Sequence, residues 1–184
     1  MTSQNNINAF SSDKFSVLFS NIPTVNQYGD LRFVYQNYIK SLTIPDMNIE
    51  MFQSHFQGSV INHPVTPDNK DYSDLLIEFK LDENFLNYYN LFEVVQEIRY
   101  GKIRKTVPSL VRDTAFKKDS LLRLYTIKSI NLLLLDNERK TQKILEFTEC
   151  FPHSISTISL EYGKSEEVNF TVNFKYQEVF LKNP

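Results

Sequence analysis

The stretch VNFTVNFKY, residues 168–176, alternates apolar and polar side chains over its whole length. Successive side chains of a β-strand point to opposite faces, so this period of two predicts a strand with one apolar and one polar face. The apolar set, expected to face the core, is Val168, Phe170, Val172, Phe174 and Tyr176. The polar set, expected to face a wet surface, is Asn169, Thr171, Asn173 and Lys175.

Strand-like patterns occupy most of the remaining chain. Residues 73–82 alternate clearly, because Leu75, Ile77 and Phe79 share one face. The segment 62–71 contains two prolines and is predicted to be a loop. The other predicted strands lie at residues 15–19, 31–44, 121–135, 140–149, 154–162 and 166–180, with two weaker ones around Ser54 and Gly58.

Residues 83–100 follow a helical period instead. Their apolar side chains recur at spacings of three and four, which predicts one amphipathic helix. Asp82 is the expected N-cap, Glu83 favours the positive end of the helix dipole, and Gly101 is placed to end the helix. Capping therefore explains the Asp82–Glu83 pair without acid–base catalysis. Runs of strands with a single helix predict a mainly β fold, an antiparallel two-sheet sandwich or barrel with one peripheral helix.

Length and composition favour one domain and exclude several functions. The chain has 184 residues, 41% of them hydrophobic, which suits a single domain over 1–184 with a polar arm at 1–13. Its net charge of −2 lacks the basic excess that dedicated duplex-DNA-binding proteins use to neutralise phosphates. The four glycines are widely spaced, so neither a dinucleotide fingerprint nor a P-loop is present, and no cofactor is expected.

The single cysteine and the polar start of the chain bear on where it is made. Cys150 has no partner for a disulfide within the chain. The first ten residues lack the basic n-region of a signal peptide, which predicts synthesis in the cytoplasm. The longest apolar run, Leu132 to Leu135, is far too short to cross a bilayer, so membrane insertion is not expected.

Two groups of side chains could carry chemistry, and each has a simpler explanation. Cys150 and His153 could be a nucleophile and its base, but a packed cysteine beside a surface histidine is favoured. His55, His63 and Asp68 could surround a metal, but their spacings match no zinc pattern and a solvated loop is favoured. We therefore expect no catalytic, cofactor or metal site, and no enzyme.

Several stretches resemble the tail tube proteins of contractile-tailed bacteriophages. EFTECFP (146–152), SISTISLEY (154–162) and VNFTVNFKYQEV (168–179) resemble the C-terminal half of that family, in which the corresponding first strand ends in an aromatic–proline turn. IEFKLDENFLNYYNLF (77–92) resembles the family's strand, acidic turn and helix. The chain departs from the pattern at Glu149–Cys150, where the family often carries a glycine, and in a long basic loop at 102–119.

The resemblance implies a structural virion protein that assembles with itself. In that family six copies close into a ring whose strands form a continuous inner barrel, and the rings stack into a hollow tail tube. The implied partners are the contractile sheath, the baseplate and the tail terminator, with DNA passing through the lumen without specific binding. The polar set Asn169, Thr171, Asn173 and Lys175 is then a candidate for the lumen wall.

The basic loop 102–119 is a candidate contact with the sheath or the adjacent ring. It holds six of the twenty basic residues, namely Lys102, Arg104, Lys105, Arg112, Lys117 and Lys118. Binding to nucleic acid would need aromatic side chains that stack on bases, or an element that enters a groove of the duplex. Phe116 is the only aromatic residue in the sequence of the loop. A merely solvated loop is an equally weighted alternative.

Three other functions stay open at this point. A tube-initiating or baseplate protein would share the fold, and so would the tube of a secretion-type injection system. A small β-rich binding module, acting as a monomer or dimer, is a more remote alternative. Oligomeric state separates that module from the tube proteins.

Overall fold

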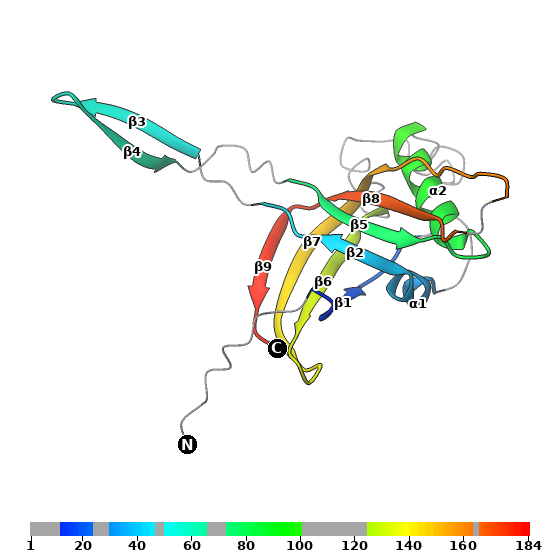
Figure 1. The fold of residues 1–184 in the computed structure, drawn as a ribbon. Coiled ribbons are helices and arrows are strands. Elements are labelled where there is room, and N and C mark those ends of the chain that lie inside the picture. Colours follow the sequence, from blue (N-terminus) through cyan, green and yellow to red (C-terminus); the bar gives the residue numbers. More distant parts are fainter. Residues whose placement is uncertain (1–11, 24–29, 47–49, 66–72, 101–124, 164–165) are drawn as a thin grey trace, which may run out of the picture.

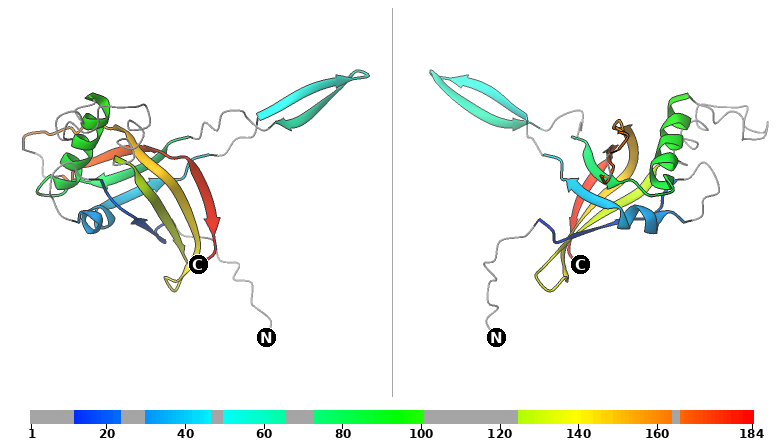
Figure 2. Two further views of the ribbon diagram at one scale, coloured as in Figure 1. Left: turned by 180° about the vertical axis from the view of Figure 1, so that it is seen from behind. Right: turned by 45° about the vertical axis from the view of Figure 1, so that its right-hand side comes forward.

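The computed structural model describes residues 12–23, 30–46, 50–65, 73–100, 125–163 and 166–184. Within them, two antiparallel sheets pack into a sandwich-like body, and a hairpin projects away from it (Figure 1, Figure 2). The mainly β, antiparallel fold predicted from the sequence is confirmed, as a sandwich rather than a closed barrel. No helix in the described part of the chain is long and apolar enough to cross a membrane.

The hydrogen-bonded strand order is β1-β6-β7-β8-β5-β2, and β9 also pairs with β7. Sheet A contains β1 (Phe15–Phe19), β6 (Ile127–Leu135), β9 (Glu178–Lys182) and the first part of β7 (Thr141–Ile155). Sheet B contains β2 (Ile39–Thr43), β5 (Leu75–Lys80), β8 (Asn169–Lys175) and the last part of β7. The hairpin is β3 (Glu50–Phe56) with β4 (Ser59–Val65), and the helices are α1 (Arg32–Asn37) and α2 (Leu86–Tyr100).

Strand β7 joins the two sheets because it bends part-way along its length. Its first part pairs with β6 and β9, whereas residues 151–155 pair with β8. Glu149 has a φ of 48°, and the register shifts between Pro152 and Ser154. Strands that turn a corner between sheets do so at such bulges, where a proline is also tolerated. The two strands predicted at 140–149 and 154–162 are therefore a single strand that ends at Ile155.

The left-handed backbone at Glu149 predicts that glycine would stabilise the protein there. A non-glycine residue in that conformation costs about 1–2 kcal/mol, and the extra chain freedom of glycine offsets part of that gain. We expect Glu149→Gly to raise the free energy of unfolding by about 0.5–1 kcal/mol, which corresponds to about 1–4 °C in melting temperature. Differential scanning calorimetry measures the shift, and a lower melting temperature would contradict this account of the bend.

The core lies between the sheets and is closed by aromatic contacts that run from β1 to α2. Phe19 lies 6.0 Å from Tyr35, which lies 5.7 Å from Phe79. Phe79 stacks on Phe170 at 5.5 Å, and Tyr88 meets Phe170 edge-on at 5.3 Å. These centroid distances fall in the range where aromatic pairs attract each other beyond their buried area. Sheet A, α1, sheet B and α2 thus share one core.

The predicted strand 31–44 is wrong over its first half, where the chain forms α1 before β2 begins. Leu31 and Tyr35 are both buried, and the amide of Tyr35 donates to the carbonyl of Leu31 across one helical turn. The Tyr35 hydroxyl donates to the carbonyl of Asn87, 2.7 Å away on α2. This buried contact with a residue distant in sequence fixes the turn as helix.

The expected N-cap at Asp82 is also wrong, because α2 begins only at Leu86. Phe85, with a φ of 60°, turns the chain just before the helix. The side chain of Asn87 forms hydrogen bonds with backbone groups of the segment that leads into α2. Its amide nitrogen donates to the carbonyl of Lys80, and its oxygen accepts a hydrogen bond from the backbone amide of Asp82. Gly101, the expected end of the helix, lies outside the described residues.

The remaining differences concern element ends. The predicted strand 166–180 is two strands, because the chain leaves sheet B after Lys175 and returns to sheet A as β9. The two short strands expected around Ser54 and Gly58 are the longer hairpin β3–β4, which also takes in residues 62–65 of the predicted loop. The basic loop and most of the N-terminal arm lie outside the described residues.

Candidate assembly interface

The outward face of sheet B is polar across its strands. In β8, Phe170, Val172 and Phe174 are buried, while the alternate residues Asn169, Thr171, Asn173 and Lys175 are half-buried on the opposite side. The register of β8 with β5 and of β5 with β2 places Glu78, Lys80, Ser41 and Thr43 on that same side. We call this surface the polar face of sheet B.

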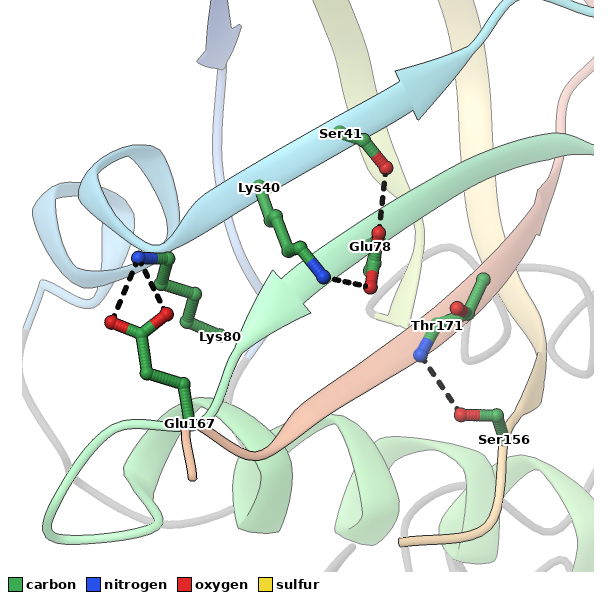
Figure 3. Close-up of polar contacts among 7 residues, drawn as sticks. All are labelled: Lys40, Ser41, Glu78, Lys80, Ser156, Glu167 and Thr171. Carbon is green, nitrogen blue, oxygen red and sulfur yellow. Dashed lines mark hydrogen bonds and ion pairs between the residues drawn. The ribbon is translucent and has the colours of Figure 1, made fainter. Parts of the chain in front are cut away.

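Ion pairs cross the polar face of sheet B between neighbouring strands (Figure 3). A register shift between Ile39 and Ser41 leaves Lys40 as the extra residue, so Lys40 and Ser41 both donate to the carboxylate of Glu78, at 2.9 and 2.8 Å. Lys80 lies 2.8 Å from Glu167. Lys175 lies 2.9 Å from Asp74. A strand bulge aims side chains in this way because it adds one residue to one strand of the pair.

These contacts shift the titration of the carboxylates. The hydrogen bonds from Lys40 and then Ser41 lower the pKa of Glu78, and the hydrogen bond from Lys80 lowers the pKa of Glu167. Hydrogen bonds to an ionised carboxylate favour the charged form. Glu78 and Glu167 therefore stay ionised at neutral pH.

Sheet B has two free edges in the described part of the chain. On one side β2 pairs only with β5. On the other side β6 stops pairing with β7 at Cys150, so residues 151–155 pair only with β8. A free edge presents unpaired backbone N–H and C=O groups that can accept a strand from another chain.

An apolar groove lies on the core side of each free edge. The α2 groove, about 610 Å³, is lined on the helix by Tyr88, Phe92 and Val95 and on β7 by Phe151, Pro152 and Ile155, among others. The β2 groove, about 250 Å³, is lined by Ser12, Phe15, Leu42, Ile44, Leu132 and Leu134. Each groove leaves apolar side chains of the sandwich open to water beside an unpaired strand, which is unfavourable for an isolated subunit.

The hairpin β3–β4 projects from the body (Figure 1). It also carries exposed apolar side chains. Phe52 and Ile61, 59% and 43% exposed, fall on one of its faces, because the register pairs Phe52 with His63 and Ser54 with Ile61. Residues 51–64 contain no Asp, Glu, Lys or Arg. A two-stranded hairpin is marginally stable alone, so an uncharged and apolar one is suited to docking on another surface.

The other chemical candidates from the sequence do not form a site in the described residues. Cys150 is fully buried, and burial raises the pKa of its thiol to about 12, so it is not a ready nucleophile for the exposed His153. No three His, Cys, Asp or Glu side chains of the described part gather closely enough to hold a metal ion. Asp68 and the six basic residues of 102–119 lie outside that part.

The two free edges of sheet B, the apolar groove beside each and the projecting hairpin are features suited to association with another chain. The sequence profile of phage tail tube proteins matches residues 11–182. The chain belongs to the phage tail tube protein family. This is a family of structural proteins, and no curated protein sequence matches the chain.

Solved structures confirm the tail tube fold at low sequence identity. The chain is similar to one from an extracellular contractile injection system, the PVC sheath–tube complex in its extended state, with a TM-score of 0.57, 9% identity and all of both chains covered. It is similar to a chain of the anti-feeding prophage baseplate, with a TM-score of 0.52, 14% identity, and 92% of this chain and 91% of the other covered. It is also similar to a chain of the anti-feeding prophage tube-terminating cap, with a TM-score of 0.52, 10% identity, and 96% and 93% covered.

Sequence patterns predicted part of this candidate interface and missed the rest. The alternation in 168–176 identified the polar side of β8. The grooves were missed because they depend on which strands end at the sheet edges, which is a matter of topology. One feature of the sequence could have indicated that the hairpin contacts another surface: residues 51–64 contain no charged side chain.

Proposed function

We propose that this tail tube protein is the main tube subunit of a contractile tail. In this proposal six copies close into a ring, rings stack into a tube inside a contractile sheath, and the tube conducts DNA. The observation that carries the proposal is the pair of free edges on sheet B, each with an apolar groove on its core side. The similar chains from a sheath–tube complex, a terminating cap and a baseplate support sheath, terminator and baseplate proteins as partners.

Ring closure follows from joining the two edges head to tail. When β2 of one copy pairs with residues 151–155 of the next, the β2 groove of the first meets the α2 groove of the second. The apolar side chains of both grooves then leave water together, which is the main favourable term in association. The two edges differ, so the contact is heterologous and closes into a ring when its rotation is right. The polar face of sheet B then continues around the ring as a lumen wall.

The hairpin β3–β4 supplies a second contact that joins rings. Its apolar side chains lie outside the sandwich, so they leave water only when the hairpin reaches another copy. The uncharged stretch 51–64 adds no charge–charge repulsion when identical rings stack.

The hairpin predicts a variant that separates rings from tubes. Phe52→Ser with Ile61→Ser removes two large exposed apolar side chains from one face of the hairpin, without touching the core of the sandwich. We expect rings by negative-stain electron microscopy but few or no stacked tubes, and a melting temperature of the subunit close to wild type. Gln53→Ser with Asn62→Ser, on the other face, is the matched control and is expected to stack normally. Tubes of normal length from the first variant would contradict a stacking role.

A tube-initiating or baseplate protein is the second candidate function. The similarity to a chain of a baseplate is nearly as high as that to the sheath–tube complex, with TM-scores of 0.52 and 0.57. In this second proposal the protein forms a single ring, and a different protein forms the rings that stack on it. A main tube subunit extends its own rings, so the length distribution of the assembled wild-type protein distinguishes the two.

A further inference from the structure

The strands of sheet B, taken with Asp74 and Glu167 just outside them, carry three lysines and three carboxylates that pair with one another on the polar face. The segments 39–43, 74–80 and 167–175 contain six charged residues. Three are the lysines Lys40, Lys80 and Lys175, and three are the carboxylates Asp74, Glu78 and Glu167. The last part of β7, residues 151–155, adds no Asp, Glu, Lys or Arg. The strands alone carry a net charge of +2, from Lys40, Lys80 and Lys175 against Glu78, and Asp74 and Glu167 just outside them bring the sum of these six residues to zero.

Each of these lysines is held by a carboxylate from a neighbouring strand or from the turn before it. Lys40 on β2 is bonded to Glu78 on β5, and Lys80 on β5 is paired with Glu167 just before β8. Lys175 at the end of β8 is paired with Asp74 just before β5. Each lysine is therefore compensated locally rather than by an average over distant charges. Figure 3 shows the pairs Lys40–Glu78 and Lys80–Glu167.

The rest of the face offers little to hold a polymer. On the outward side β2, β5 and β8 carry the short polar residues Ser41, Thr43, Asn169, Thr171 and Asn173, besides Leu76. The outward positions of β2, β5 and β8 carry no aromatic side chain on which unpaired bases could stack. On the fourth strand of sheet B, Phe151 lies opposite Lys175 and lines the α2 groove. Affinity for duplex DNA comes mainly from cations that displace the counterions of phosphates, and here each lysine already has a carboxylate partner.

We propose that the polar face of sheet B is a charge-compensated channel wall, along which a polyanionic polymer such as duplex DNA moves without being held, and that Asp74, Glu78 and Glu167 prevent the three lysines from retaining it. This inference rests on the proposed tube, since only ring closure turns the face into a channel. Every copy in a ring adds three lysines to the wall, so loss of compensation multiplies around and along the tube.

The test removes the compensation and keeps the shape. In Asp74→Asn/Glu78→Gln/Glu167→Gln each carboxylate is replaced by the amide of similar size. Tubes of wild type and variant are first verified by negative-stain electron microscopy, then incubated with a short fluorescent DNA duplex, treated with nuclease and sedimented. DNA inside the lumen is protected from the nuclease, whereas DNA on the outer surface is digested.

We expect the variant tubes to retain at least about tenfold more protected DNA than wild type at about 50 mM salt, and to lose most of it by about 200 mM. A matched control, Glu83→Gln/Glu138→Gln/Glu161→Gln, makes the same change in net charge away from the face and is expected to behave as wild type. Adding Lys40→Gln, Lys80→Gln and Lys175→Gln to the first variant is expected to return retention to the wild-type level.

Three results would overturn the inference while leaving the tube itself established. The first is equal amounts of protected DNA in wild type and the carboxylate variant. The second is DNA retention by the carboxylate variant that persists when the three lysines are also replaced. The third is a control variant that retains as much DNA as the carboxylate variant. If the triple variant assembles poorly, Glu167→Gln alone is used, because this residue lies outside the strands and its side chain is 71% exposed. A single uncompensated lysine per copy is expected to raise retention to a smaller degree, and wild-type retention would count against the proposal. Failure of every form, wild type included, to build tubes would instead refute the proposed function.

Discussion

Phe174→Asp is expected to leave the protein unable to fold. Phe174 is 1% exposed and lies between Leu75 of β5 and Pro152 of β7 in the register of sheet B. Truncating a buried phenylalanine costs about 3–5 kcal/mol, and burying a carboxylate with no partner costs several more. The sum is comparable to the whole stability of a typical domain, about 5–15 kcal/mol. The measurement is soluble yield together with circular dichroism of any soluble fraction.

The neighbouring residue provides the control. Asn173 is half-buried on the polar face of sheet B, where an added carboxylate keeps its contact with water. We expect Asn173→Asp to fold, with a change in the free energy of unfolding of about 1 kcal/mol or less. Equal yields and spectra from the two variants would show that the assigned faces of β8 are wrong.

Ile44→Lys is expected to block ring closure while leaving the subunit folded. Ile44 lines the β2 groove and is 48% exposed, so a lysine there keeps its ammonium in water in the monomer. In the proposed ring the same position enters the α2 groove of the next copy, where an unpaired charge costs several kcal/mol. At about 1.4 kcal/mol for each factor of ten, the concentration needed for assembly rises by roughly a hundredfold or more. Sedimentation velocity across a concentration series measures it.

Phe180→Lys makes the same kind of change at a site away from the two edges of sheet B. Phe180 lies on β9 of sheet A and is 44% exposed, close to the exposure of Ile44. Its variant is expected to assemble at the wild-type concentration. If Ile44→Lys assembles as readily as Phe180→Lys, the β2 edge is not part of the ring contact.

The strands with a period of two were predictable because burial of one face requires apolar residues at every second position of the sequence. In β8 and β5 every second side chain enters the core, and the alternation predicted both strands and their faces. The helix α2 was predictable for the same reason, with a period of three to four. Where a local pattern fits only one type of secondary structure, it predicts that element correctly.

The segment 31–44 was mispredicted because its pattern has two readings. Its aromatic and β-branched residues favour a strand, while Leu31 and Tyr35 also have the spacing of one helical turn. The hydrogen bond from the Tyr35 hydroxyl to the carbonyl of Asn87 favours the helix over the strand, and it forms only in the tertiary structure. The bulge at Lys40, which completes the first ion pair of the polar face, was missed for the same reason.

The proposed assembly surface was least predictable, because it consists of strand edges that the fold leaves unpaired. Pro152 was taken as the end of a strand, yet β7 continues through a bulge there and becomes the free edge of sheet B. Which strand ends a sheet is fixed by long-range pairing, and local patterns do not record it.

The most direct test of the central claim is negative-stain electron microscopy of the purified wild-type protein across a concentration series. The account predicts closed rings at low concentration and hollow stacked tubes as the concentration rises, because the edges and the hairpin all lie on the one chain. A protein that stays monomeric at every concentration would contradict self-assembly through sheet B.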